Sequence, residues 1–204
     1  MQISYNYEKW CETLNNFRKD FYQRSFDLFC RQITGLIVSE NKTITGCNNQ
    51  FTTPVDQSNL NRFLTEYPWS KDDVRDTLMS LLKKKRIPSS FSYFILDDTI
   101  LEKVGKSIDS VGYHRSHNKG YLFGHQVVTS GYIFRAQFFP FIIELYTKKE
   151  DAEKEDIKFR TKVEIALDIL TEAISFHKPS IVLIDSWYYT QKVINLFRSA
   201  KKSS

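Results

Sequence analysis

The second half of the chain contains several apolar segments that lack helical periodicity and alternate with amphipathic segments. The apolar segments are rich in β-branched and aromatic residues, which is typical of strands. We expect strands at residues 91–100, 121–134, 138–146 and 180–185, and helices at residues 151–176 and 189–200. Five of the seven glycines fall between Gly105 and Gly131, which indicates loops and hairpins there. The order β-β-β-α-β-α predicts an α/β fold with a mixed sheet.

The first ninety residues differ, because their apolar residues recur near helical spacing, beginning at residues 7–37. Asp56 is a candidate N-cap for QSNLNRFLTEY, and Ser70 for SKDDVRDTLMSLLKKK. Short helices joined by turns suit a helix-turn-helix-like bundle, which either packs as a structural module or reads DNA. We therefore expect a helical region at 1–89 and an α/β domain at 90–204, divided near Pro88.

Composition restricts the class of protein only loosely. The 204 residues are 41% hydrophobic and 15% aromatic, which excludes wholesale disorder. The 29 basic and 24 acidic residues leave a net charge of +5, which permits nucleic-acid binding without requiring it. Three cysteines without a CxxC pair indicate a reducing compartment. With neither a signal peptide nor an apolar run of about 20 residues, we expect a soluble, cytoplasmic protein without a membrane partner.

Two apolar segments that lie far apart in the sequence each run into an aspartate. Phe94-Ile95-Leu96 precedes Asp97, and Val182-Leu183-Ile184 precedes Asp185. Open α/β sheets build their sites at the carboxyl ends of strands. Burying an unpaired carboxylate costs several kcal/mol. A bound Mg²⁺ ion, whose usual ligands are carboxylates and substrate phosphates, would remove that cost. The alternative is that each aspartate forms a turn or caps a helix.

A second aspartate follows the first strand, so the candidate ligand has to be chosen between Asp97 and Asp98. Successive side chains of a strand point to opposite faces, so only one of the two carboxylates can face Asp185. Asp97 follows its apolar run directly, as Asp185 does, and is the better candidate. We expect Asp98 to bond with Thr99 or with a nearby basic side chain.

These residues resemble a known family. The stretch LDDTILEKVGKSIDSVGYHRSHNKGYLFGHQVVTSGY is similar to the first catalytic block of DDE-type insertion-sequence transposases, and IDSWYYTQKVI resembles their second aspartate block. The lead-in segments ITGLIVSENKTI and NRFLTEYPWSKDDV are also similar to that group. The resemblance spans roughly Phe26 to Ile194.

The resemblance implies an RNase H-like nuclease fold in which the first and fourth strands lie side by side, with Asp97 and Asp185 as catalytic and metal-binding residues. It also implies phosphoryl transfer with two Mg²⁺ or Mn²⁺ ions, in which a water or a DNA 3′-hydroxyl attacks a phosphodiester. The implied partners are transposon-end DNA and other transposase copies in a synaptic complex.

The family also requires a third carboxylate, a glutamate beyond the second aspartate, and no glutamate follows Asp185 in these 204 residues. We therefore expect the N-terminal portion of a transposase, produced by truncation, a frameshift or a split reading frame, which cleaves poorly or not at all alone. One alternative is a DNA-binding protein without catalysis, such as an inhibitor that acts at transposon ends. The other is a decayed fragment that does not fold stably.

Basic residues outside the aspartate segments are candidates for DNA phosphate contacts. They are Lys83, Lys84, Lys85, Arg86, Lys103, Lys106, Arg115 and Lys119. His114 and His117 are expected beside Arg115 on a turn that meets phosphate, rather than at a zinc site. The aromatic run Trp187-Tyr188-Tyr189 is expected to pack in the core, with base stacking as the alternative.

Overall fold

The computed structural model describes residues 7–84, 91–105, 108–116 and 119–202. The chain divides into two compact units, Met1–Lys85 and Arg86–Ser204. Each unit is described separately. No helix within the described ranges is both long and apolar enough to span a membrane.

The first unit is helical. Its elements are α1 (Tyr7–Asn15), the short 3-10 helix η2 (Arg18–Asp20), α2 (Gln23–Val38), α3 (Ile44–Asn48), α4 (Gln57–Thr65) and α5 (Lys71–Lys84). The helical segment expected over residues 7–37 is two helices, because the chain turns between them and packs Phe21 back onto Phe29, with ring centroids 4.5 Å apart. The expected caps are present: Asp56 accepts a hydrogen bond from the Ser58 amide, and Ser70 from the Asp72 amide.

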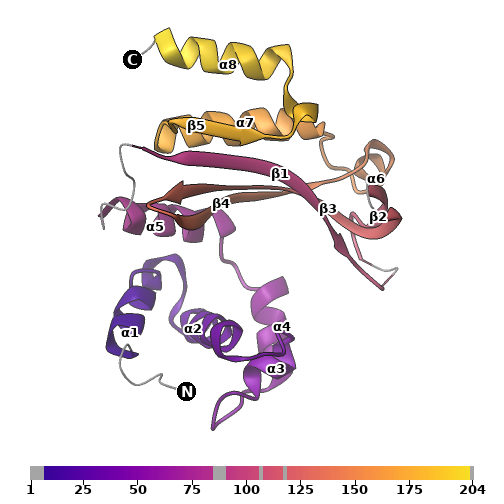
Figure 1. Cartoon of the computed structure of the whole chain (residues 1–204). Helices are drawn as coiled ribbons and strands as arrows, with labels where there is room; N and C mark the ends of the chain where they lie inside the picture. The colour runs from indigo at the N-terminus through magenta and orange to yellow at the C-terminus, as the bar shows by residue number, and fades with distance from the viewer. Residues whose placement is uncertain (1–6, 85–90, 106–107, 117–118, 203–204) are drawn as a thin grey trace. The chain divides into compact units, whose positions relative to one another are not determined.

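The described residues of the second unit form a five-stranded mixed sheet with helices, which confirms the α/β prediction and is consistent with an RNase H-like fold (Figure 1). The elements are β1 (Tyr93–Glu102), β2 (Gly112–Ser116), β3 (Gly120–Phe134), β4 (Gln137–Tyr146), α6 (Lys149–Lys154), α7 (Lys162–Phe176), β5 (Ile181–Ile184), the 3-10 helix η3 (Ser186–Tyr188) and α8 (Gln191–Lys202). The strand order is β2-β3-β1-β5, and β4 also pairs with β3. The β1–β5 pair is parallel and the other pairs are antiparallel.

The core of this unit lies between α7 and one face of the sheet. Phe94 and Leu96 of β1 and Tyr132 of β3 are all at most 1% exposed, and α7 packs against β3 and β4. The hydroxyl of Tyr132 donates hydrogen bonds to the carbonyls of Ala173 (2.6 Å) and His177 (2.9 Å), which anchors the end of α7 to the sheet. Because side chains alternate along β1, Asp98 lies on this α7 face and Asp97 on the opposite face.

Three details differ from the sequence expectations. The helix expected at 151–176 is two helices, because Asp156 takes a positive φ of 51° and Thr161 starts α7 with a capping box to Glu164. The short strand β2 forms a hairpin with β3 that was expected only as part of a loop and hairpin region. Strand β1 covers Tyr93–Glu102 where residues 91–100 were expected, so Asp97 lies in the middle of the strand and not at its carboxyl end, because the long strand β3 pairs with β1 over this whole length.

Candidate active site

The register of β1 and β5 brings Asp97 and Asp185 to neighbouring positions. The last paired residues of the two parallel strands are Leu96 and Ile184, and each aspartate follows its paired residue directly. Asp185 retains an extended backbone, with φ −61° and ψ 147°. Since neighbouring strands lie about 4.8 Å apart, the two carboxylates start from adjacent backbone positions.

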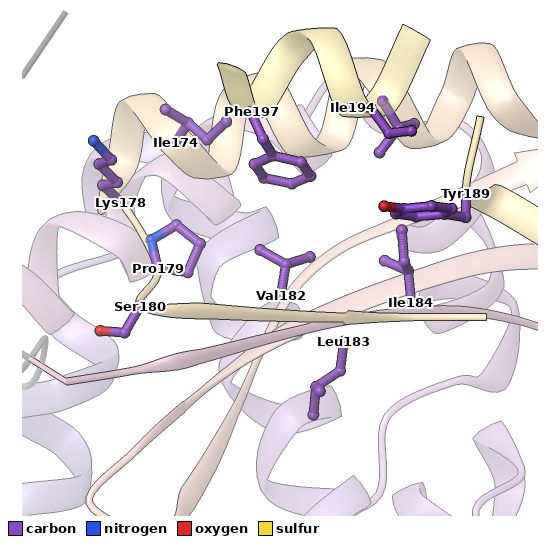
Figure 2. A pocket seen from close by; sticks show the side chains of 11 residues that line it. Ile174, Lys178, Pro179, Ser180, Val182, Leu183, Ile184, Tyr189, Ile194 and Phe197 are labelled. Carbon is purple, nitrogen blue, oxygen red and sulfur yellow. The ribbon is translucent and has the colours of Figure 1, made fainter. Parts of the chain in front are cut away.

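Figure 2 shows how side chains alternate along β5. Val182 and Ile184 point toward Ile194 and Phe197 of α8, whereas Leu183 points to the other side of the strand. The side facing α8 holds an apolar cavity of about 500 Å³, and neither Asp97 nor Asp185 lines it. Asp185 continues the alternation on the side of Leu183. Leu183 pairs with Ile95, two residues before Asp97, so Asp97 and Asp185 share one face of the sheet.

Both carboxylates are exposed, and in each only the Oδ1 atom accepts a hydrogen bond among the described residues. The Oδ1 atom of Asp97 accepts the Asp98 amide at 2.8 Å, and the Oδ1 atom of Asp185 accepts the Trp187 amide at 2.7 Å. Asp185 therefore does cap η3, which is the structural role weighed against metal binding. Within the described part of the chain, the Oδ2 atom of each carboxylate accepts no hydrogen bond. Because both are exposed, burial creates no need for a cation, but two adjacent negative charges favour one.

Asp98 occupies a different environment on the α7 face. Its carboxylate accepts hydrogen bonds from the Tyr188 hydroxyl (2.7 Å), Gln126 Nε2 (2.6 Å) and Lys162 Nζ (3.1 Å). Burial raises the pKa of Asp98, but these bonds and the Lys162 charge outweigh it and hold the pKa below its ordinary value. The expected basic partner is Lys162, and Thr99 is not among the partners of this carboxylate in the described residues.

The aromatic run after Asp185 divides between core and surface. Tyr188 is fully buried, as expected, while the Trp187 and Tyr189 side chains are exposed. Burial raises the pKa of Tyr188 far above its ordinary value, and the charges of Asp98, Asp97 and Asp185 raise it further. The Tyr188 hydroxyl therefore stays protonated near all three carboxylates and acts as a donor.

Sequence reasoning did not identify the groups that surround Asp98. Gln126 lies inside the first stretch that resembles the family but was given no role there, and Lys162, at the first position of α7, lies outside both stretches. Tyr188 was identified only as a core residue.

The basic candidates are distributed over both units. Lys83 and Lys84 lie in the last turn of α5, whereas Lys103, Arg115 and Lys119 are exposed in the second unit. Lys119 pairs with Glu102 at 3.5 Å. Lys85, Arg86, Lys106 and His117 lie outside the described residues. No described contact joins these basic side chains to Asp97 or Asp185.

The expectation for His114 is wrong. This residue lies within β2, not on a turn, and its side chain is only 5% exposed, so it does not meet phosphate. Burial lowers the pKa of His114, and the charges of Lys148 and Lys162 lower it further. The neutral imidazole is thus the form that the fold accommodates.

This environment predicts a specific acid sensitivity. Because the pKa of His114 is lower in the folded chain than in the unfolded chain, its contribution to stability is complete above the ordinary histidine pKa of about 6.5 and is lost as the pH falls through the folded value. The melting temperature should therefore fall more between pH 7.5 and pH 5 in the wild type than in His114→Gln, as thermal unfolding at the two pH values would show. Equal losses in both proteins would contradict the assignment.

The comparison with protein families identifies the family to which the chain belongs. Residues 17–197 match the family model described as DDE superfamily endonuclease, and this range contains both Asp97 and Asp185. The chain belongs to the DDE superfamily endonucleases. The resemblance found in the LDDTI and IDSWYY segments is thereby confirmed at the level of the family. Comparison with curated proteins and with solved structures gave no match.

Membership in the DDE superfamily endonucleases supports DNA as the substrate and a divalent metal such as Mg²⁺ as the cofactor. Asp97 and Asp185 fit such an ion, because they provide hard oxygen ligands on one face, each with an Oδ2 atom that accepts no hydrogen bond in the described part of the chain. Among the described residues of this family member, no group of three or more His, Cys, Asp or Glu side chains could hold a metal ion. If an ion binds at Asp97 and Asp185, the described residues would provide two carboxylates, and water, phosphate or other groups would fill the remaining coordination positions.

Proposed function

We propose that this endonuclease-family chain acts in the transposition of an insertion sequence, cutting and joining phosphodiester bonds at transposon ends. The observation that carries the proposal is the pairing of β1 and β5, which places Asp97 and Asp185 on one face at adjacent positions. This juxtaposition depends on two segments far apart in the sequence, so it is a property of the fold and not of a local turn.

Asp97 and Asp185 are the proposed ligands of the metal ions. When bound there, divalent ions would help to ionise the attacking water or DNA 3′-hydroxyl and would stabilise the leaving oxygen. The exposure of both carboxylates leaves room for a DNA phosphate beside them. Each Oδ1 atom is bonded to a backbone amide, which orients the carboxylate and leaves Oδ2 to the ion.

The surrounding parts of the chain would then serve to bind DNA and assemble the complex. We assign DNA binding to the helical region at 1–89 and phosphate contacts to the exposed cations of both units. Other transposase copies in a synaptic complex are the proposed protein partners. The net charge of +5 is compatible with this role.

A non-catalytic role at transposon ends is a second candidate, favoured by a specific observation. Asp97 and Asp185 stand at neighbouring positions, but the described residues contain no group of three or more His, Cys, Asp or Glu side chains that could hold a metal ion. We therefore expect the 204-residue chain alone to bind transposon ends and to cleave them weakly or not at all. In that state it would act as an end-binding protein or as an inhibitor that occupies the ends.

The test combines a gel-shift and a nicking assay on terminal inverted repeats, with DNA of shuffled sequence as the control. The wild type, Asp97→Asn and Asp185→Asn should all shift the repeats, with no more than trace nicking in Mg²⁺ or Mn²⁺. Equal binding to shuffled DNA would overturn the assignment to transposon ends. Robust cleavage by the wild type would overturn the expected inactivity and leave catalysis as the function.

A further inference from the structure

We propose that Tyr188 is a positioning residue whose hydroxyl links the turn after Asp185 to strand β1 and thereby fixes Asp185 relative to Asp97. The proposal deepens the function proposed above and rests on it, because it concerns the same carboxylate pair. Tyr188 is not assigned contact with metal or DNA. Its role is exerted through the backbone on which Asp185 stands.

The need for such a link follows from where the strand pairing stops. The hydrogen-bonded register of β1 and β5 ends at Leu96 and Ile184, immediately before the two aspartates. Beyond that point β1 continues alongside β3, whereas the chain after Asp185 turns into η3. The strand ladder therefore does not itself fix the position of the Asp185 turn relative to Asp97.

The Tyr188–Asp98 hydrogen bond supplies that link. The hydroxyl of Tyr188 donates to Oδ1 of Asp98 at 2.7 Å, across 90 residues of sequence. Asp98 is the residue next to Asp97, and Tyr188 lies three residues after Asp185. Hydrogen bonds to an ionised acceptor are stronger than neutral ones, and this one is partly buried, with a fully buried donor residue.

Asp98 is itself a fixed anchor, because both of its oxygens are engaged. Its Oδ2 atom accepts from Gln126 of β3 at 2.6 Å and from Lys162 of α7 at 3.1 Å. Side chains from three elements thus converge on one carboxylate, behind the face that carries Asp97. Because the Asp98 carboxylate is held in place, its hydrogen bond keeps the Tyr188 hydroxyl at a fixed position relative to β1.

The turn after Asp185 is also held at Trp187. The Trp187 amide donates to Oδ1 of Asp185 at 2.7 Å, and Lys162 Nζ lies 4.6 Å from the centroid of the Trp187 ring. Protection of the Trp187 amide from hydrogen exchange therefore reports on whether the turn that carries Asp185 keeps its structure. This readout needs neither metal nor DNA.

The test compares Tyr188→Phe with Tyr189→Phe in the full chain. Tyr188→Phe keeps the buried ring and removes only the hydroxyl, while Tyr189→Phe removes a neighbouring hydroxyl from a side chain that is 68% exposed. By NMR of the metal-free chain, Tyr188→Phe should accelerate Trp187 amide exchange roughly five- to tenfold. By calorimetry, it should weaken Mn²⁺ binding about tenfold. Tyr189→Phe should match the wild type in both measurements.

The outcomes separate this proposal from the proposed function. Unchanged Trp187 exchange in Tyr188→Phe overturns the positioning role, whatever metal binding shows. Accelerated exchange in a chain whose wild type binds no Mn²⁺ supports the positioning role and overturns the proposed metal site. If Tyr188→Phe does not fold, Gln126→Leu replaces it, because Gln126 donates to Asp98 and has no described contact with Trp187: faster Trp187 exchange than in the wild type supports the anchor at Asp98, and unchanged exchange contradicts it.

Discussion

Replacing either carboxylate of the proposed pair, as Asp97→Asn or Asp185→Asn, is expected to weaken Mn²⁺ binding by about 100-fold or more. Each substitution removes a charged oxygen ligand from a site whose described residues offer only two. The loss should therefore exceed the 10- to 100-fold effect typical of residues that only orient a ligand. Titration calorimetry of the purified chain measures it directly.

Two controls make this result specific. Asp109→Asn, at an exposed aspartate outside the pair, should leave Mn²⁺ binding unchanged. Asp98→Asn should weaken binding less than Asp97→Asn, because Asp98 acts through Tyr188 and Lys162. If Asp98→Asn lost most of its Mn²⁺ affinity while Asp97→Asn kept the wild-type affinity, Asp98 would be the ligand and the assignment would be contradicted.

The second large effect is expected in the core of the sheet unit. Tyr132 is 1% exposed, lies against the rings of Phe94 (4.8 Å between centroids) and Phe134 (5.0 Å), and anchors α7 through its hydroxyl. Tyr132→Ala should lower the free energy of unfolding by about 3–5 kcal/mol, because it leaves a large cavity between the sheet and α7. Urea denaturation followed by circular dichroism provides the measurement.

Tyr132→Phe is the matched variant. It keeps the ring and loses only the hydrogen bonds to the Ala173 and His177 carbonyls, so the free energy of unfolding should fall by about 1 kcal/mol. A cooperative transition in the wild type with this graded response would argue against a decayed fragment. No cooperative transition, or equal effects of both substitutions, would contradict the packing described for this core.

The sequence predicted the strands of the sheet well because their apolar runs are continuous. Residues 121–134 and 138–146 correspond closely to β3 and β4, and residues 180–185 contain β5. The resemblance to the family implied that the first and fourth strands are neighbours, and the parallel pairing of β1 with β5 confirms it. Composition and periodicity alone did not specify that neighbour.

The missed features depend on local backbone geometry and on contacts distant in sequence. The break between α6 and α7 arises from the positive φ of Asp156 and the cap at Thr161, which lie within an otherwise helical pattern. The partners of Asp98 come from β3, α7 and η3, up to 90 residues away, and no pattern along one strand reveals them. Alternation along β1 separated Asp97 from Asp98 but could not identify what the second carboxylate binds.

The most direct test of the account is a crystal structure of the chain soaked in Mn²⁺, with the ion located by its anomalous scattering. We expect an anomalous peak bound by the carboxylate oxygens of Asp97 and Asp185, with Asp98 still bonded to Tyr188 and Lys162. A peak at Asp98 in place of Asp97, or full Mn²⁺ occupancy elsewhere with none at this pair, would contradict it.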